Sequence, residues 1–433
     1  MRKAVIMVLV LCLLLGGCSW DALSVQETEP SKWHLTETLP AITIPEQLEH
    51  PLKQAYQEQP NAYVAFNQTH QQPLEVYVPI EEVMAYQTQY PDCNGTWYRD
   101  QLQGEDLLIY QCYLYAMEHC YLSFLVYVED NDRDFDFIRE AFSMDTPLLE
   151  QNINQRGESI SDWPTNYWGE RLHIRLEQFT VSRWEKRMEA LEQCRRIVAE
   201  IPVEYSTQLQ KMEYLYRYVC DHVEYVEYEN MLDEDYFYDA VIKGQTVCDG
   251  YSNMLMLLFR LIGVECCELS GYDVDLSSDE VYEDAGGHTW VAAKVEEEWY
   301  HFDATFGDNE RNEWAWDGLY FGFSDRRLAK AFLECEDMRP KCTDLSRDFP
   351  NADLTVSDIT EGSDVKKIAR MVEKRLKEGC LETTIGVHSQ VTEADHSTMI
   401  KKYQKYATDA YRLEFSYIEI GSSTLMFITA TKE

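Results

Sequence analysis

The stretch from Gly244 to Asp303 constrains the fold of this chain most strongly, because it holds three reactive residue types in a telling order. Cys248 follows a glycine turn and precedes apolar residues at helical spacing. This pattern predicts a helix that begins at the cysteine and ends before Gly263. His288 and Asp303 lie on two later apolar stretches, which read as strands. The order Cys, His, Asp is that of a nucleophile, a base and a group that orients the base.

The two predicted strands, 286–295 and 299–303, form a hairpin with a turn near Glu296. This hairpin places His288 and Asp303 within a residue or two of opposite positions. Cross-strand neighbours have Cβ atoms about 5 Å apart, so a carboxylate can hold an imidazole there. The helix then has only to pack on the sheet to deliver the thiol. At the helix start, the dipole favours a thiolate, and outward backbone N–H groups can hold an oxyanion.

Three short motifs in this region resemble a known family. They are the block from Tyr238 to Ser252, the run Gly287-His288-Thr289-Trp290, and the run from Trp299 to Phe306. Their order and spacing closely resemble the bacterial transglutaminase-like domain, and the run 320–325 looks like the strand that follows in those proteins. The resemblance covers residues 180–335, which is less than half of the chain.

The resemblance implies an α+β, papain-like fold, in which the helix bearing the cysteine packs on an antiparallel sheet bearing the histidine and the aspartate. It also implies a catalytic triad of Cys248 as nucleophile, His288 as general base and acid, and Asp303 as orienting group. Members of the family attack an amide, form a thioester and pass the acyl group to an amine or to water. The expected partner is therefore a protein or peptide substrate, with no cofactor and no metal.

Several alternatives remain open at this stage. The fold could persist as a catalytically silent binding or scaffold module, with Cys248 as an ordinary buried thiol. His301 lies two residues before Asp303 and is a second candidate for the base. The family's additional oxyanion donor varies; Tyr225 or Tyr228 could serve, or both could be core residues. The acidic loop 273–284 could be a solvated loop, a cation site or a lid over the active site.

The N-terminus has the pattern of an export signal. Arg2 and Lys3 precede an apolar run, and Leu15-Gly16-Gly17-Cys18 resembles the bacterial lipoprotein box. We expect Cys18 to be lipidated, so that the protein is exported and held at the outer face of the bacterial cytoplasmic membrane. The alternatives are an ordinary signal peptide or an uncleaved anchor. Residues 19–60 lack a clear period and are rich in polar residues and proline, which predicts a tether.

Charge and cysteine content narrow the function further. The net charge is −39, from 77 acidic against 38 basic residues, which argues against nucleic acid as a partner. Of the 13 cysteines, Cys12 lies in the predicted signal, Cys18 is the expected lipidation site and Cys248 is the candidate nucleophile. The others can be disulfides or small buried thiols. The chain has no C-x-x-C pair, which argues against a structural zinc site. Nothing here predicts the oligomeric state.

The sequence predicts a catalytic domain over 170–343, with two smaller α/β regions at 61–160 and 358–433. Strands are expected at 62–66, 75–79, 107–114 and 121–129, with a helix at 134–142 and a boundary loop at 152–168. The catalytic domain should open with a strand at 171–180 and helices at 182–200 and 208–223. A polar linker is expected at 344–357. After it we expect a helix at 365–376 and strands at 383–387, 413–420 and 424–429.

Overall fold

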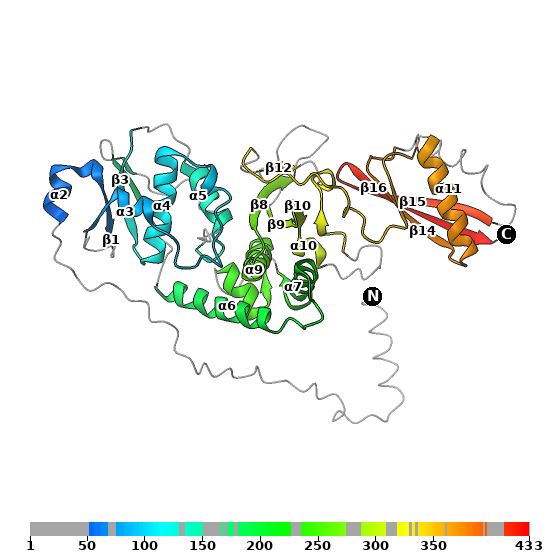
Figure 1. Cartoon of the computed structure of the whole chain (residues 1–433), viewed down its shortest axis with the longest axis horizontal. Helices are drawn as coiled ribbons and strands as arrows, with labels where there is room; N and C mark the ends of the chain where they lie inside the picture. The colour runs from blue at the N-terminus through cyan, green and yellow to red at the C-terminus, as the bar shows by residue number, and fades with distance from the viewer. Residues whose placement is uncertain are drawn as a thin grey trace, which may run out of the picture. The chain divides into compact units, whose positions relative to one another are not determined.

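The computed structural model of the chain (Figure 1) describes residues 52–67, 75–129, 135–149, 166–167, 171–176, 181–226, 235–273, 287–308, 318–328, 331–333, 337–359, 362–392, 395 and 411–432. Cys18, the predicted signal and most of the predicted tether lie outside these residues. So do residues 274–286, which make up most of the acidic loop. Across the described segments, no helix has the length and apolar character needed to cross a bilayer.

The N-terminal region is an antiparallel sheet with helices. Its strand order is β2-β1-β3-β5-β4. The strands are β1 (Tyr63–Asn67), β2 (Glu75–Pro79), β3 (Ser123–Tyr127), β4 (Asn166–Tyr167) and β5 (Arg171–Arg175), and the helices are α2 (Leu52–Glu58), α3 (Ile80–Ala85), α4 (Gly104–Glu118) and α5 (Phe135–Asp145).

Three expectations for this region are wrong. The strand expected at 171–180 as the opening of the catalytic domain is β5, which pairs with β3 and β4 of this N-terminal sheet. The strand expected at 107–114 is part of helix α4, in which every residue from Leu108 to Glu118 is buried. A helix buried on all sides shows no polar face, so its sequence carries no helical period, and its tyrosines mimic a strand. The end of the predicted tether also belongs to the fold: α2 forms there, and the Tyr56 ring lies 4.3 Å from the Tyr77 ring of β2, centroid to centroid.

The central region is confirmed as α+β. Helix α9 (Cys248–Leu261) packs on strands β8 and β9 of a five-stranded sheet with the order β11-β10-β9-β8-β12 (Figure 1). The strands are β8 (Cys266–Asp273), β9 (His288–Val295), β10 (Glu298–Phe302), β11 (Phe321–Phe323) and β12 (Ala331–Leu333). Helices α6 (Val181–Ala199) and α7 (Gln208–His222) precede α9 and lie close to their predicted ranges. A capping box between Thr207 and Gln210 starts α7.

The hairpin of β9 and β10 has the predicted form. Val295 pairs with Glu298 across a two-residue turn, and Val291 pairs with Phe302. Glu296 in the turn has a left-handed φ of 58°. This register places Asp303, the residue after β10, beside the start of β9, where His288 lies.

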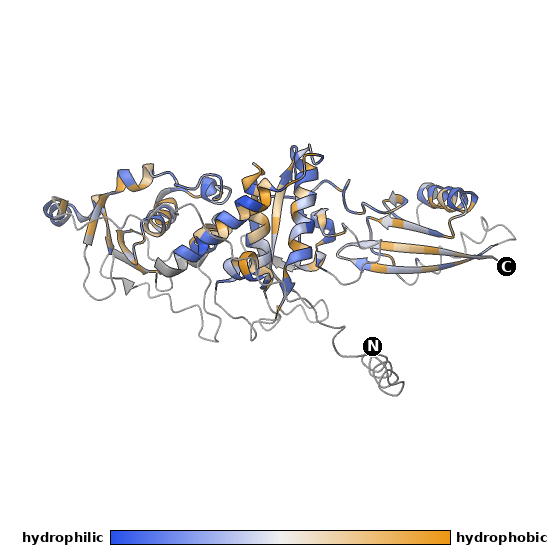
Figure 2. Cartoon of the chain, turned by 90° about the horizontal axis from the view of Figure 1, so that it is seen from below, coloured by the Kyte–Doolittle hydropathy of each residue, from blue (hydrophilic) through white to orange (hydrophobic). Residues whose placement is uncertain are grey.

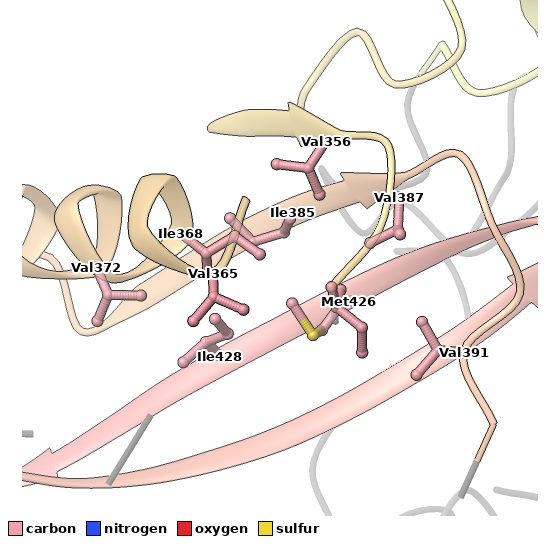
Figure 3. Packing of buried hydrophobic residues seen from close by; sticks show 10 residues of the cluster. Val356, Val365, Ile368, Val372, Ile385, Val387, Val391, Met426 and Ile428 are labelled. Atoms are coloured by element: carbon pink, nitrogen blue, oxygen red, sulfur yellow. The ribbon is translucent and has the colours of Figure 1, made fainter. Parts of the chain in front are cut away.

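The C-terminal region is a four-stranded sheet with the order β13-β14-β16-β15, covered by α11 (Gly362–Lys377). The strands are β13 (Leu354–Val356), β14 (Glu382–Val387), β15 (Tyr411–Ile420) and β16 (Ser423–Lys432). Figure 2 shows α11 as mostly hydrophilic. Three of its apolar residues, Val365, Ile368 and Val372, pack with Ile385 and Ile428 of the sheet in one core (Figure 3).

The prediction of a polar linker at 344–357 is wrong. Asp348 and Phe349 are both buried, and Leu354–Val356 forms a strand parallel to β14. Asp348 is polar, but it accepts hydrogen bonds from the backbone N–H and the hydroxyl of Ser324. A buried aspartate whose hydrogen bonds are all made cannot be distinguished from an exposed one in the sequence, because the sequence does not show which groups donate to it. The described part of the chain contains ten cysteines, all free thiols.

Candidate active site

Cys248 is the first residue of α9, and the chain around it is shaped to place it there. A π-helical turn (Asp239–Lys243) ends at Gly244, whose φ of 66° is left-handed and suits glycine. The short strand β7 (Gln245–Thr246) follows and pairs with β6 (Glu224–Tyr225). Gly250 is also required, since a Cβ there would collide with the Thr246 hydroxyl and the Tyr236 carbonyl oxygen. The Cys248 residue is 4% exposed.

His288 and Asp303 form a close pair. The imidazole Nε2 of His288 lies 2.8 Å from Oδ2 of Asp303. The other carboxylate oxygen, Oδ1, accepts the backbone N–H of Phe306 at 3.0 Å and so caps the short helix α10 (Ala304–Gly307). The backbone of Asp303 is held as well, because its N–H donates to the Tyr320 carbonyl and its own carbonyl accepts from the Tyr216 hydroxyl. Hydrogen bonds therefore fix both the side chain and the backbone of Asp303.

Two aromatic rings lie nearly parallel to the imidazole of His288. The Phe306 ring centroid is 4.4 Å away with an interplanar angle of 28°, and the Trp290 ring is 5.7 Å away with an angle of 19°. Phe306 is 49% exposed although it is large and apolar. These rings limit how the imidazole can turn about its side-chain bonds and keep solvent from its faces.

The thiol of Cys248 completes the cluster. Its sulfur lies 3.9 Å from the carbonyl oxygen of Gly287, the residue before His288. Burial alone would lower the pKa of His288, but the Asp303 charge, its hydrogen bond, and the hydrogen bond and charge of Cys248 raise that pKa from 6.5 to about 10. The imidazole is therefore protonated at neutral pH. Because Asp303 occupies Nε2, Nδ1 is the nitrogen left to face the sulfur.

A second group of polar side chains, which sequence reasoning missed, ties the thiol helix to the histidine strand. The Ser252 hydroxyl, one turn after Cys248, donates to Oε2 of the buried Glu268 at 2.6 Å. The same hydroxyl lies 3.1 Å from the hydroxyl of Thr289, the residue after His288. The signal available in the sequence was Glu268, which stands between Cys267 and Leu269 in a stretch, 264–271, that is expected to be a buried strand.

The structure thus brings Cys248, His288 and Asp303 together. His301, the second candidate for the base, is fully buried, and both of its ring nitrogens have other partners, Trp290 and Asp325. Tyr225 is 44% exposed, which rules out a core role for it. Tyr228 lies outside the described residues.

Comparison with known proteins points to the same part of the chain. The family model of the transglutaminase-like superfamily matches residues 195–304, which contain all three residues of the cluster. Two curated proteins named kyphoscoliosis peptidase, from Mus musculus and Homo sapiens, are each 27% identical to this chain over 116 residues. The match takes in 26% of this chain and 18% of each relative, so the chain spans about a fifth of the relatives' length.

Two solved structures are similar over parts of the chain. A cysteine protease candidate from Cytophaga hutchinsonii shares 17% identity at a TM-score of 0.21, over 27% of this chain and 37% of that one. A protease candidate from Parabacteroides distasonis shares 9% identity at a TM-score of 0.23, over 64% of this chain and 57% of that one. TM-scores this low add no argument about the site.

Proposed function

The chain carries a transglutaminase-like domain over residues 195–304, and from this premise we propose that it is a cysteine enzyme acting on amide bonds. In this proposal Cys248 is the nucleophile, His288 the general acid and base, and Asp303 the orienting group. The observation that carries the proposal is the cluster itself: an imidazole held by a buried carboxylate on one side, with a thiol at a helix start on the other.

The proposed reaction begins from a thiolate on Cys248 and an imidazolium on His288. The sulfur attacks the amide carbonyl carbon and forms a C–S bond, while the carbonyl oxygen gains the negative charge. Backbone N–H groups at the start of α9 are suited to hold that charge. The tetrahedral intermediate collapses, the C–N bond breaks, and the imidazolium gives its proton to the leaving amine. This yields a thioester and a neutral imidazole.

In the second half the neutral imidazole acts as a base. It takes a proton from water or from an amine, which attacks the thioester carbonyl and displaces the Cys248 thiolate. Water completes a hydrolysis and gives a carboxylic acid, whereas an amine completes an acyl transfer and gives a new amide. His288 regains its proton in either case, so the same side chains serve a peptidase and a transferase.

An assay with three readouts separates these reactions. The purified protein is given a glutamine-containing peptide and a labelled primary amine, and ammonia release, peptide cleavage and label incorporation are measured. Incorporation indicates transfer, and cleavage or ammonia release without incorporation indicates hydrolysis. Cys248→Ala should abolish both. Cys266→Ala, which removes another buried thiol, is the matched control and should keep activity.

Activation of the thiol can be tested without knowing the substrate. Iodoacetamide should label Cys248 at pH 6 far faster than it labels the other thiols, and His288→Ala should remove this advantage. Equal, slow labelling of all thiols would instead favour the silent binding or scaffold module.

We also propose that the enzyme works at the cell envelope, attached through a lipid on Cys18. The support is the lipoprotein-box resemblance at Leu15 to Cys18. Cells expressing the chain should incorporate a labelled fatty acid into it, and Cys18→Ala should abolish the label. Label retained in Cys18→Ala would refute this anchor and leave the catalytic proposal intact.

A further inference from the structure

A second cluster of reactive side chains lies on the same sheet as the active site. Ligand-type atoms of His301, Asp325 and Cys342 all lie within 4.8 Å of one another. His301 is on β10 and fully buried, and Asp325 follows β11. A histidine, a carboxylate and a thiol at this spacing would suit a metal ion, so the hydrogen bonds of each group decide what the cluster does.

The protein already uses the atoms that would bind a metal. The indole Nε1–H of Trp290 lies 3.0 Å from Nδ1 of His301, and an indole can only donate. Nδ1 is therefore the acceptor, and the proton of the ring sits on Nε2, which donates to Oδ1 of Asp325 at 2.9 Å. A metal at Nε2 would have to displace this proton while Trp290 holds the other nitrogen. The same Oδ1 accepts from Nη1 of Arg339 at 2.6 Å, and Oδ2 accepts the Cys342 backbone N–H at 3.1 Å.

The charges agree with this direction of donation. Burial lowers the pKa of His301, so the ring is neutral at neutral pH. Burial would raise the pKa of Asp325, but the hydrogen bonds from His301 and Arg339 and the charge of Arg339 lower that pKa below its usual value, so the carboxylate is ionised. The result is a continuous relay in which Trp290 donates to His301, His301 donates to Asp325, and Arg339 balances the carboxylate.

The first member of the relay contacts the proposed catalytic base. The Trp290 ring lies nearly parallel to the His288 imidazole, 5.7 Å from it, while its N–H is tied to His301. An indole held at its N–H cannot rotate freely about its side-chain bonds, so its face stays against the imidazole. Trp290 thereby links this hydrogen-bonded series to the imidazole. His301, Asp325 and Arg339 act through Trp290 and do not touch the reacting atoms.

We propose that Trp290, His301, Asp325 and Arg339 form a positioning relay for His288, which keeps the imidazole aligned between Asp303 and Cys248. The relay rests on the proposed function, because it acts on the base of that reaction. Trp290 is its contact with the active site, and His301 and Asp325 are positioning residues that act through it. The cluster with Cys342 is then part of this support and not a metal centre.

Iodoacetamide labelling of Cys248, followed by mass spectrometry at pH 6 and pH 9.5, tests the relay in the full chain. At pH 6 the thiolate depends on its pairing with a well-placed imidazolium, whereas near pH 9.5 an ordinary thiol ionises without help. Trp290→Phe keeps a ring beside His288 but removes the N–H. It should lower the pH 6 rate by about two- to tenfold, the range of an aromatic contact, and leave the pH 9.5 rate unchanged.

Two further variants make the test specific. Trp299→Phe changes a tryptophan on β10 that packs edge-on against Trp97 and should leave both rates unchanged. His301→Phe keeps the ring volume but removes the acceptor for the indole, and it should reproduce the pH 6 loss. If Trp290→Phe disrupts folding, which labelling of the buried Cys267 would reveal, His301→Phe decides the question.

The outcomes separate the relay from the proposed function. Unchanged pH 6 labelling in a folded Trp290→Phe or His301→Phe protein, with fast His288-dependent labelling in the unaltered protein, overturns the relay alone. Equal losses at both pH values in a folded variant also overturn it, because altered access and not alignment would then be the cause. If Cys248 of the unaltered protein is labelled slowly, and His288→Ala does not change that rate, the proposed function and the relay are both overturned.

Discussion

Nε2 of His288 and Oδ2 of Asp303 lie 2.8 Å apart, on residues separated by 15 positions in the chain. The hairpin of β9 and β10 brings them together, and the cap on α10 uses the second carboxylate oxygen. The carboxylate is thus bound by two contacts of different kinds, one to the imidazole and one to the backbone N–H of Phe306.

Asp303→Asn separates these two roles. An asparagine can still cap α10, but it has no charge to stabilise the imidazolium and can force the wrong tautomer. We expect turnover to fall by about 10³- to 10⁴-fold while the protein stays folded. Amide cleavage or transfer measured beside a thermal melt checks this. A variant that keeps more than a tenth of the turnover would show that Asp303 does not orient the base.

The raised pKa of His288 predicts how stability depends on pH. Between pH 6.5 and about 10 the folded protein holds a proton that the unfolded chain has released, so this stabilisation is complete below pH 6.5 and is lost as the pH rises towards 10. Denaturant unfolding of the native protein and of His288→Gln should therefore differ most near pH 6 and converge near pH 10. A difference that grows with pH would contradict the ion pair.

Gly250→Ala tests how the start of α9 is packed. The added Cβ would collide with Thr246 and the Tyr236 carbonyl, so the helix start and Cys248 must shift. We expect a loss of about 1–3 kcal/mol in the free energy of unfolding and a loss of Cys248 labelling at pH 6. Gly379→Ala is the control, because its φ of 84° strains the backbone while nothing lies near the new Cβ. It should lower stability but leave the labelling unchanged.

Ser252→Ala removes a hydrogen bond to the buried Glu268 carboxylate and the contact with Thr289. The free energy of unfolding should fall by about 1–3 kcal/mol, as is usual when a buried charged group loses a donor. Urea unfolding measures the change. Ser206→Ala, on an exposed serine before α7, should change stability by less than about 0.5 kcal/mol. Equal effects of the two substitutions would show that the buried contact adds nothing.

The sequence predicted the elements of the site closely because local rules determine them. Glycines bracket α9, and a two-residue turn fixes the register that puts Asp303 beside the start of β9. The predictions that failed concern elements whose structure depends on partners distant in the sequence. Helix α4 lacks a polar face because it is buried all round, and Asp348 is buried because Ser324 supplies its donors.

The supports of the site were out of reach for the same reason. Glu268 and Ser252 are 16 residues apart, and Asp325 and His301 are 24 apart. No periodicity in the sequence indicates which polar side chains meet across a core. Each of these residues, considered alone, is compatible with an ordinary surface position.

The short hairpin has a consequence for the newly made protein. Contacts between residues that are near in the chain form sooner than distant ones, and the imidazole and the carboxylate share one tight turn. The sulfur comes from a helix 40 residues earlier and joins them only when α9 docks on the sheet. A chain that is still being made therefore carries Cys248 as an ordinary, unactivated thiol. The thiol becomes reactive only in the folded domain, where the surrounding structure determines which molecules can reach it.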